Sequence, residues 1–279
     1  MSKALRRKPR SRRAPELLTG KRHYPRHIFI PDTQVRPGVP INHIEAAGNY
    51  IREKQPDVVV IAGDWWDMPS LSSYEEKGSA YFHDKTFRAD VDAGNHAMGV
   101  FMHAASRPVH SGSRRGTRRV DPRYVFLDGN HEHRIWRASH RDPVLRGTVT
   151  RDALALGGLE VHPFLKPVCI DGVLYCHYFV NPHSLKKNIL CGTIDNRLNK
   201  IKQSFTMGHQ QTRMFGSQYT LQGREIMGLV AGAFYQHDEE YAGPQGNHYW
   251  RGIVVKNEVH QGRYDPCFVS LDYLLRKYL

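Results

Sequence analysis

The chain lacks any long hydrophobic run, since no apolar stretch approaches the roughly 20 residues that span a bilayer. Its four cysteines, Cys169, Cys176, Cys191 and Cys267, form no Cys-x-x-Cys pair. A zinc knuckle or a redox pair is therefore not expected, and free thiols in a reducing cytoplasm fit best. No apolar segment follows the N-terminal charges, so we expect no secretory signal, no membrane partner and a cytoplasmic location.

Acidic residues are scarce at the N-terminus, where the first 26 residues hold ten lysines and arginines against one acid, Glu16. Such a segment cannot bury a core, so residues 1–23 are predicted to be a disordered basic arm preceding one folded domain, 24–279. The net charge of +13 indicates an anionic partner such as nucleic acid. A second basic segment, the loop from Arg114 to Arg119, is a further candidate contact with nucleic acid.

What the sequence does contain is a set of short apolar strands, each followed by polar residues. The strand predicted at Tyr124–Leu127 runs into Asp-Gly-Asn-His-Glu at 128–132, where glycine permits a sharp turn. Gly-Asn-His also occurs at 94–96, inside a helix predicted at 86–105, and at 246–248, in a loop. Only the copy that begins at residue 129 follows a strand, which favours a site there.

Earlier strands are predicted at 27–30 and 57–62, with a helix between them at 41–53. This alternation of strand and helix predicts a mainly parallel sheet. The second half is expected to be richer in strands. Its predicted elements are a hairpin at 168–170 and 173–176, a helix at 193–202, and strands at 204–207, 225–231, 249–256 and 267–271. Long loops at 68–85 and 236–248 are expected to rim a site.

Oxygen and imidazole side chains stand just past the carboxyl ends of five predicted strands. They are Asp32, Asp64, Asn130, His177 and His209. Open α/β sheets bind ligands at that edge, and these side chains are of the types that hold divalent metals. The sequence therefore predicts a metal site.

In order and spacing these residues resemble the calcineurin-like metallophosphoesterases. The family pattern is Asp-x-His, Gly-Asp-x-x-Asp, Gly-Asn-His-Asp/Glu, a solitary His, and Gly-His-x-His. Over residues 27–213 the chain reads Asp32-Thr-Gln34, Gly63-Asp64-Trp-Trp-Asp67, Gly129-Asn130-His131-Glu132, His177, and Gly208-His209-Gln-Gln211. The resemblance implies an α/β protein with a four-layer α/β/β/α sandwich of two mixed sheets, and a hydrolase that uses two divalent ions.

The resemblance also implies the ligand sets of the two ions. The first set is Asp32, Gln34, Asp64 and Gln211. The second set is Asp64, Asn130, His177 and His209, with Asp64 as the bridge. The family's histidine is glutamine at 34 and 211, and an amide is a weaker ligand than imidazole. We therefore expect a weak first site that favours Mn²⁺ or Mg²⁺, with Zn²⁺ or Fe also open. In the alternative, one ion binds and both glutamines contact the substrate.

Further roles follow from the same resemblance and from the neighbouring residues. His131 would not bind metal but would contact the phosphate and protonate the leaving oxygen, with Asp67 orienting it. Arg134 and Arg137 are predicted either to grip a phosphate backbone or to form a solvated helix face. The aromatic residues Trp65, Trp66 and Tyr74 are either core residues or platforms for base stacking.

The interpretation is a metal-dependent phosphodiesterase or nuclease that cleaves nucleic acid, with manganese as the expected metal. Two alternatives remain open from the sequence. One is a phosphomonoesterase acting on a protein, a nucleotide or a small metabolite. The other is a binding scaffold built on an inactive phosphoesterase fold, for which the weakened first metal site would be the evidence.

Overall fold

The structure, a computed structural model, describes residues 23–76, 78–106, 121–181, 184, 188–239, 243–246 and 248–279. The predicted basic arm, apart from residue 23, and the loop from Arg114 to Arg119 lie outside these ranges, so both stay predictions. Among the described residues, no helix combines the length and apolar character needed to cross a membrane.

The first sheet is mixed and has the strand order β11-β10-β1-β2-β3-β4. Its strands are β1 (His27–Ile30), β2 (Val58–Ile61), β3 (Arg123–Leu127), β4 (Glu160–His162), β10 (Gly252–His260) and β11 (Arg263–Ser270). The strands β1 to β4 pair in parallel, while β10 is antiparallel to β1 and to β11. All residues of β1 and β2 are buried, which explains why these strands are continuous apolar runs.

The second sheet is also mixed and has the order β5-β6-β7-β9-β8. Its strands are β5 (Val168–Ile170), β6 (Val173–Tyr175), β7 (Phe205–Met207), β8 (Arg213–Tyr219) and β9 (Glu225–Ala231). The β5–β6 hairpin is antiparallel as expected, and β6, β7 and β9 run parallel to one another. The carboxyl ends of β6 and β7 consequently lie at the same edge.

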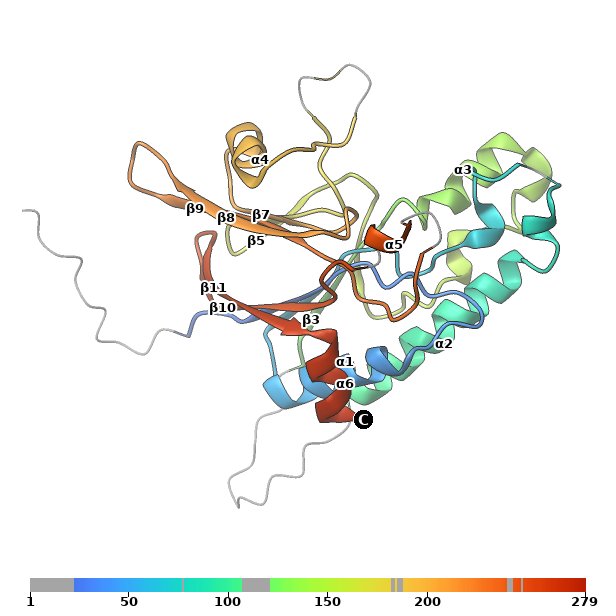
Figure 1. Ribbon diagram of the computed structural model, residues 1–279, viewed down its shortest axis with the longest axis horizontal. Coiled ribbons are helices and arrows are strands. Elements are labelled where there is room, and N and C mark those ends of the chain that lie inside the picture. The colour runs from blue at the N-terminus through green and yellow to red at the C-terminus, as the bar shows by residue number, and fades with distance from the viewer. Residues whose placement is uncertain are drawn as a thin grey trace, which may run out of the picture.

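Helices cover the outer face of each sheet, and the two inner faces pack together. Figure 1 shows α4 (Ile194–Ile201) on one side of the molecule and α1 (Asn42–Lys54), α2 (Phe87–Ser106) and α6 (Leu271–Tyr278) on the other. Successive residues of β1 alternate between these layers, since Ile28 packs on the helix side and Phe29 between the sheets. The expected four-layer α/β/β/α sandwich of two mixed sheets is confirmed within the described residues.

Shorter helices complete the described chain. They are α3 (His133–Arg141), α5 (Gly243–Gly246) and 3₁₀ turns at Pro69–Leu71, Ala80–Phe82, Pro143–Leu145 and Arg151–Ala153. The sequence pattern missed α3, α6, β4 and β8. The strand β8 lies at a sheet edge and none of its residues is fully buried, so it carries no apolar run to reveal it.

A lysine is buried between the sheets, where none was expected. Lys256 has no exposed surface, and its ammonium group donates to the hydroxyls of Thr206 and Tyr175, the latter at 3.3 Å. Its Nζ also lies 4.5 Å from the ring centre of Tyr175 and 4.4 Å from that of Tyr264. Burial lowers the pKa of Lys256 well below its ordinary value.

This buried lysine should make the stability of the protein depend on pH. Between its folded pKa and its unfolded pKa of about 10.4, the unfolded chain binds more protons, so stability rises with pH. We expect Lys256→Met to flatten this rise, which has an upper limit of about 1.4 kcal/mol per pH unit. Urea unfolding between pH 7 and 9 measures it, with exposed Lys166→Met as control. Equal slopes in wild type and Lys256→Met would contradict the assignment.

Candidate metal centre

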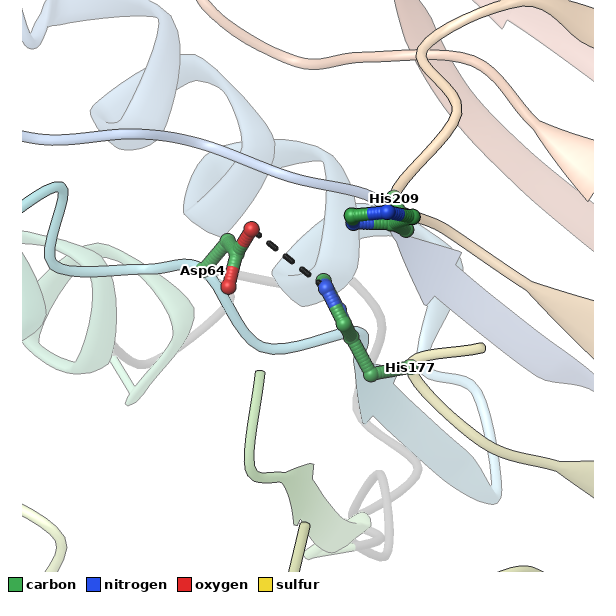
Figure 2. A group of neighbouring side chains, drawn as sticks. All are labelled: Asp64, His177 and His209. Carbon is green, nitrogen blue, oxygen red and sulfur yellow. Dashed lines mark ion pairs between the residues drawn. The ribbon is translucent and has the colours of Figure 1, made fainter. Parts of the chain in front are cut away.

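The loops that follow β2, β6 and β7 bring three potential metal ligands together. Asp64, His177 and His209 each offer one ligand atom, and these atoms all lie within 4.8 Å of one another. Figure 2 shows the three side chains converging from separate segments of the chain. Asp64 follows a strand of the first sheet, whereas His177 and His209 follow strands of the second sheet. Packing of the two sheets therefore creates this candidate metal site.

The orientation of His177 points one nitrogen at the cluster. Its Nδ1 lies 2.8 Å from the carbonyl oxygen of Ala62, which can only accept, so Nδ1 carries a proton. Its Nε2 then faces two acceptors, Asn130 Oδ1 at 2.9 Å and Asp64 Oδ2 at 3.3 Å. Burial lowers the pKa of His177, but the Asp64 carboxylate outweighs burial and raises it to about 9. These acceptors surround a position that favours positive charge, as a metal ligand set does.

Asp32 and Gln34 add buried acceptors without donors. One carboxylate oxygen of Asp32 accepts from the backbone N–H of His209 at 2.9 Å. Its other oxygen and Oε1 of Gln34 are both buried and have no hydrogen-bond donor among the described residues. Burial raises the pKa of Asp32 to about 6. Buried acceptors of this kind are costly unless a proton or cation satisfies them, so the donor set fits a divalent cation.

Gln211 is placed differently from Gln34. Gln211 is half-buried in the wall of a cavity that Asp64 and Asn130 also line. Its Oε1 accepts from the hydroxyl of Tyr235 at 2.7 Å. Ligation by either glutamine stays a prediction.

The backbone is left-handed at four of the predicted ligand positions. The φ angles are 45° at Gln34, 48° at Asp64, 65° at His209 and 56° at Gln211. Side chains other than glycine rarely adopt this region, and each such residue costs on the order of 1 kcal/mol. Strain of this kind persists only where the surrounding structure enforces it, and it gathers at functional sites.

Two glycines of the motifs make room for the carboxylates. A Cβ at Gly129 would lie 2.1 Å from Oδ1 of Asp64, and one at Gly208 would lie 2.3 Å from Oδ1 of Asp32. No side chain fits at either position without displacing the carboxylate. These glycines are therefore required by close approach of a predicted ligand, whereas neither has the positive φ that would make glycine necessary for a turn.

Glu132 ties the loop after β2 to the loop after β3, a role that the sequence did not reveal. Its buried carboxylate accepts from the backbone N–H groups of Asp64 at 2.9 Å, Trp65 at 2.8 Å and Trp66 at 3.2 Å. It also accepts from the N–H of Gly129 at 2.9 Å. One carboxylate thus fixes the backbone on both sides of Asp64.

His131 lies beside the cluster and is held by an acid. Its Nδ1 lies 2.9 Å from Oδ1 of Asp67, and its Nε2 lies 3.7 Å from Oδ2 of Asp64. Burial lowers the pKa of His131. The charges of Asp64 and Asp67 raise this pKa by more than burial lowers it, so the net shift is upward. His131 lines a cavity of about 630 Å³ together with Asp64, Asn130 and His209.

The two predicted arginines occupy different environments. Arg134 is buried in the cavity wall, where Nη1 donates to the carbonyl oxygens of Asp67 at 2.9 Å and Met68 at 3.0 Å. Its Nη2 lies 3.0 Å from Nε2 of His131. The alternative prediction that Arg134 lies on a solvated helix face is therefore wrong. Arg137 is half-buried and does not line this cavity.

A chain of charged groups continues from Asp67 around the cavity, and the sequence analysis did not identify it. Arg36 Nη1 lies 2.9 Å from Asp67 Oδ2 and 2.9 Å from Glu239 Oε1. His237 Nε2 lies 2.7 Å from the same oxygen of Glu239. Tyr74 and Tyr81 from the loop at 68–85, and Glu239 from that at 236–248, line the cavity, so both loops rim it as expected.

The two tryptophans are core residues, so base stacking by them is wrong. Trp65 is 1% exposed and Trp66 is fully buried. Trp66 packs edge-on against Phe126, and a Cβ at Gly94 would lie 1.9 Å from its ring. The Gly-Asn-His copy at 94–96 is thus a helical segment packed against this core, whereas Tyr74 is 85% exposed at the cavity.

Comparison with known proteins gives likeness of fold. No protein-family model and no curated protein sequence matches the chain. Among solved structures, the chain is similar to a conserved uncharacterized protein, a predicted phosphoesterase from Streptococcus pneumoniae TIGR4. The TM-score is 0.36 at 11% identity, covering 90% of this chain and 92% of that one. It is also similar to Yfce, a phosphoesterase from E. coli, with a TM-score of 0.38, 11% identity, and coverage of 88% and 100%. Likeness at these values carries no argument about activity.

We expect Gly129→Ala to weaken divalent metal binding, because the added methyl group displaces Asp64. The loss should be about 10- to 100-fold, the range found when a group that positions a ligand is removed. Isothermal titration with Mn²⁺ measures the affinity. Gly157→Ala is the matched control, since a Cβ there meets nothing within 4 Å. If Gly129→Ala binds Mn²⁺ like wild type, Asp64 is not a ligand.

Proposed function

We propose that the protein is a metal-dependent phosphoesterase that hydrolyses the phosphodiester bonds of nucleic acid. The observation that carries the proposal is the position of His131. An imidazole without a place among the clustered ligands lies in the cavity wall beside Asp64, braced by Asp67. This is the arrangement needed for a group that protonates a leaving oxygen next to a metal-bound phosphate.

The cluster of Asp64, His177 and His209 supports one metal site, and the remaining ligands are those that the family resemblance implies. Asp64, Asn130, His177 and His209 would hold one divalent ion, and Asp32, Gln34, Asp64 and Gln211 a weaker one, with Mn²⁺ or Mg²⁺ best suited to the amide oxygens. When bound, such ions lower the pKa of water and neutralise charge on the phosphate. The hydrogen bond from His177 Nδ1 to the carbonyl oxygen of Ala62 orients the ring, so that Nε2 points to the ligand cluster.

His131 would give a proton to the leaving oxygen of the phosphate ester. Asp67 holds Nδ1, so Nε2 is the nitrogen that faces the cavity and the leaving oxygen. The Arg134 guanidinium, fixed by the carbonyl oxygens of Asp67 and Met68, can only donate, so His131 Nε2 at 3.0 Å accepts from it in this structure and would carry a proton only once that contact is released. His131 and Arg134 together offer a cationic contact for a phosphate oxygen.

Charge at the cavity favours a diester over a monoester. A monoester phosphate carries about two negative charges near neutral pH, whereas a diester carries one. Arg36, the second arginine of the cavity wall, is paired with two carboxylates, Asp67 and Glu239, so its charge is already offset. The net charge of +13 supports a polyanionic substrate. A scaffold without activity is disfavoured by the retained strain and unsatisfied buried acceptors at the ligand positions.

Purified protein with Mn²⁺ is expected to hydrolyse bis-p-nitrophenyl phosphate faster than the monoester. Loss of the acid in His131→Ala should lower turnover by about 10²- to 10⁴-fold, because general acid catalysis contributes that much. Elemental analysis should find its metal content unchanged, whereas His177→Ala should lose metal. Preference for the monoester would indicate a phosphatase, and hydrolysis of neither ester would indicate a scaffold. Metal loss in His131→Ala would refute its role as the acid.

The basic arm is expected to bind the nucleic-acid backbone. Deleting residues 1–23 should weaken binding of a DNA strand and reduce the slope of log affinity against log salt, because each neutralised phosphate releases counterions. Fluorescence anisotropy at several salt concentrations measures the slope, with His131→Ala present in both proteins to prevent cleavage. An unchanged slope would exclude the arm from substrate binding.

A further inference from the structure

A column of stacked rings lies along α3, outside the candidate metal centre. His133 stacks on Trp136 with 4.9 Å between ring centres and 14° between planes, and Trp136 stacks on His140 at 3.9 Å and 30°. Phe164 stacks on the other side of His133 at 4.6 Å and 25°. The three α3 residues are spaced by three and four positions, so they lie on one helix face. We call Phe164, His133, Trp136 and His140 the ring column.

The ring column connects to the metal centre through Tyr178. The ring of Tyr178 meets Phe164 edge-on at 5.5 Å, and it lies 4.7 Å from the ring of His209, a predicted metal ligand. Contacts between aromatic rings therefore run without interruption from the ligand cluster to the surface of α3. Adjacent cavity space of about 480 Å³ is lined by His133, Trp136 and Phe164.

The outer part of the ring column is exposed to solvent. Trp136 is 52% exposed and His140 is also exposed, in contrast to Trp65 and Trp66 of the core. A large aromatic side chain left in water is informative when it forms part of a built surface. Here Trp136 lies between His133 and His140, which cover part of its faces, so the surface open to an unpaired base is the exposed remainder of the indole together with the exposed ring of His140.

Positive charge accompanies the ring column. Residues 133–151 contain five arginines, at 134, 137, 141, 146 and 151, against one acid, Asp142. Burial and then the charges of Arg134 and Arg141 lower the pKa of Arg137. Arg146 and Arg151 line the cavity beside the rings, where Arg151 is paired with Asp128. Rings interleaved with cations fit a strand that carries both bases and phosphates.

We propose that the ring column binds unpaired bases of a single-stranded nucleic acid whose phosphate is held at the metal centre. The inference rests on the proposed function, since it assigns a substrate class to that same site. A double helix keeps its bases stacked on one another and offers none to the rings, so a single strand is the occupant that the stack selects. The arginines of α3 would contact the phosphates that flank the bound bases.

The test compares strands with and without bases. In the His131→Ala background with Mn²⁺, binding of a fluorescein-labelled oligothymidylate is measured by anisotropy, next to an abasic strand of equal length. Trp136→Ala is expected to weaken oligothymidylate binding roughly tenfold, because base–aromatic stacking contributes on that order. It should leave abasic-strand binding unchanged. Trp136→Phe should retain most of the affinity, and Tyr219→Ala, which removes a more exposed ring from β8, should have no effect.

Two results would overturn the inference. One is oligothymidylate binding by Trp136→Ala that equals wild type, and the other is an equal loss for the abasic strand, which would assign Trp136 to backbone binding or to local packing. Hydrolysis of bis-p-nitrophenyl phosphate keeps this test separate from the proposed function. A wild-type protein that fails to hydrolyse it refutes the phosphoesterase, whereas strand binding still tests the ring column directly.

Discussion

The candidate site depends on one buried carboxylate, that of Asp64. Burial raises the pKa of such a group, but the charges of His131 and His177 outweigh burial and lower it, so Asp64 is ionised. Its Oδ1 accepts from the backbone N–H of His131 at 2.9 Å, and its Oδ2 faces the imidazoles. A charge held in the interior needs compensation by protonated imidazole or by a cation, and the neighbouring acceptors favour the cation.

The loops around Asp64 adopt locally unfavourable backbone conformations, and these position the buried carboxylate. Left-handed backbone at Asp64 and His209, and a glycine at 129 where any side chain would clash, are unfavourable choices when each is considered singly. The two sheets compensate, because their apolar inner faces pack together and fix the strand ends from which these loops start. The site thus contains strained backbone and close contacts, whereas the sheets below it pack by ordinary apolar burial. This combination is expected for a functional centre.

The cavity wall links segments that are far apart in the chain. A series of ion pairs joins the loops after β1, β2 and β3 to the loop between β9 and β10, through Arg36, Asp67, His131 and Glu239. Such a series positions the His131 imidazole relative to the ligand cluster and fixes which of its nitrogens faces the cavity. On the other side, Tyr178 links His209 to the ring column on α3. Aromatic contacts thus connect the ligand cluster to the surface of α3.

The sequence by itself determined the positions of most strands along the chain and the polar residues that follow them. Buried parallel strands must be apolar along their whole length, so the positions of Asp64, Asn130 and His209 after them were visible.

Only the tertiary structure decided that Trp65 and Trp66 are core, that Glu132 joins two loops and that α3 carries a ring column. The same holds for Arg134, which lies in the cavity wall. Each of these depends on which surface another segment covers, and covering a surface is a property of packing between distant residues, which no local pattern records.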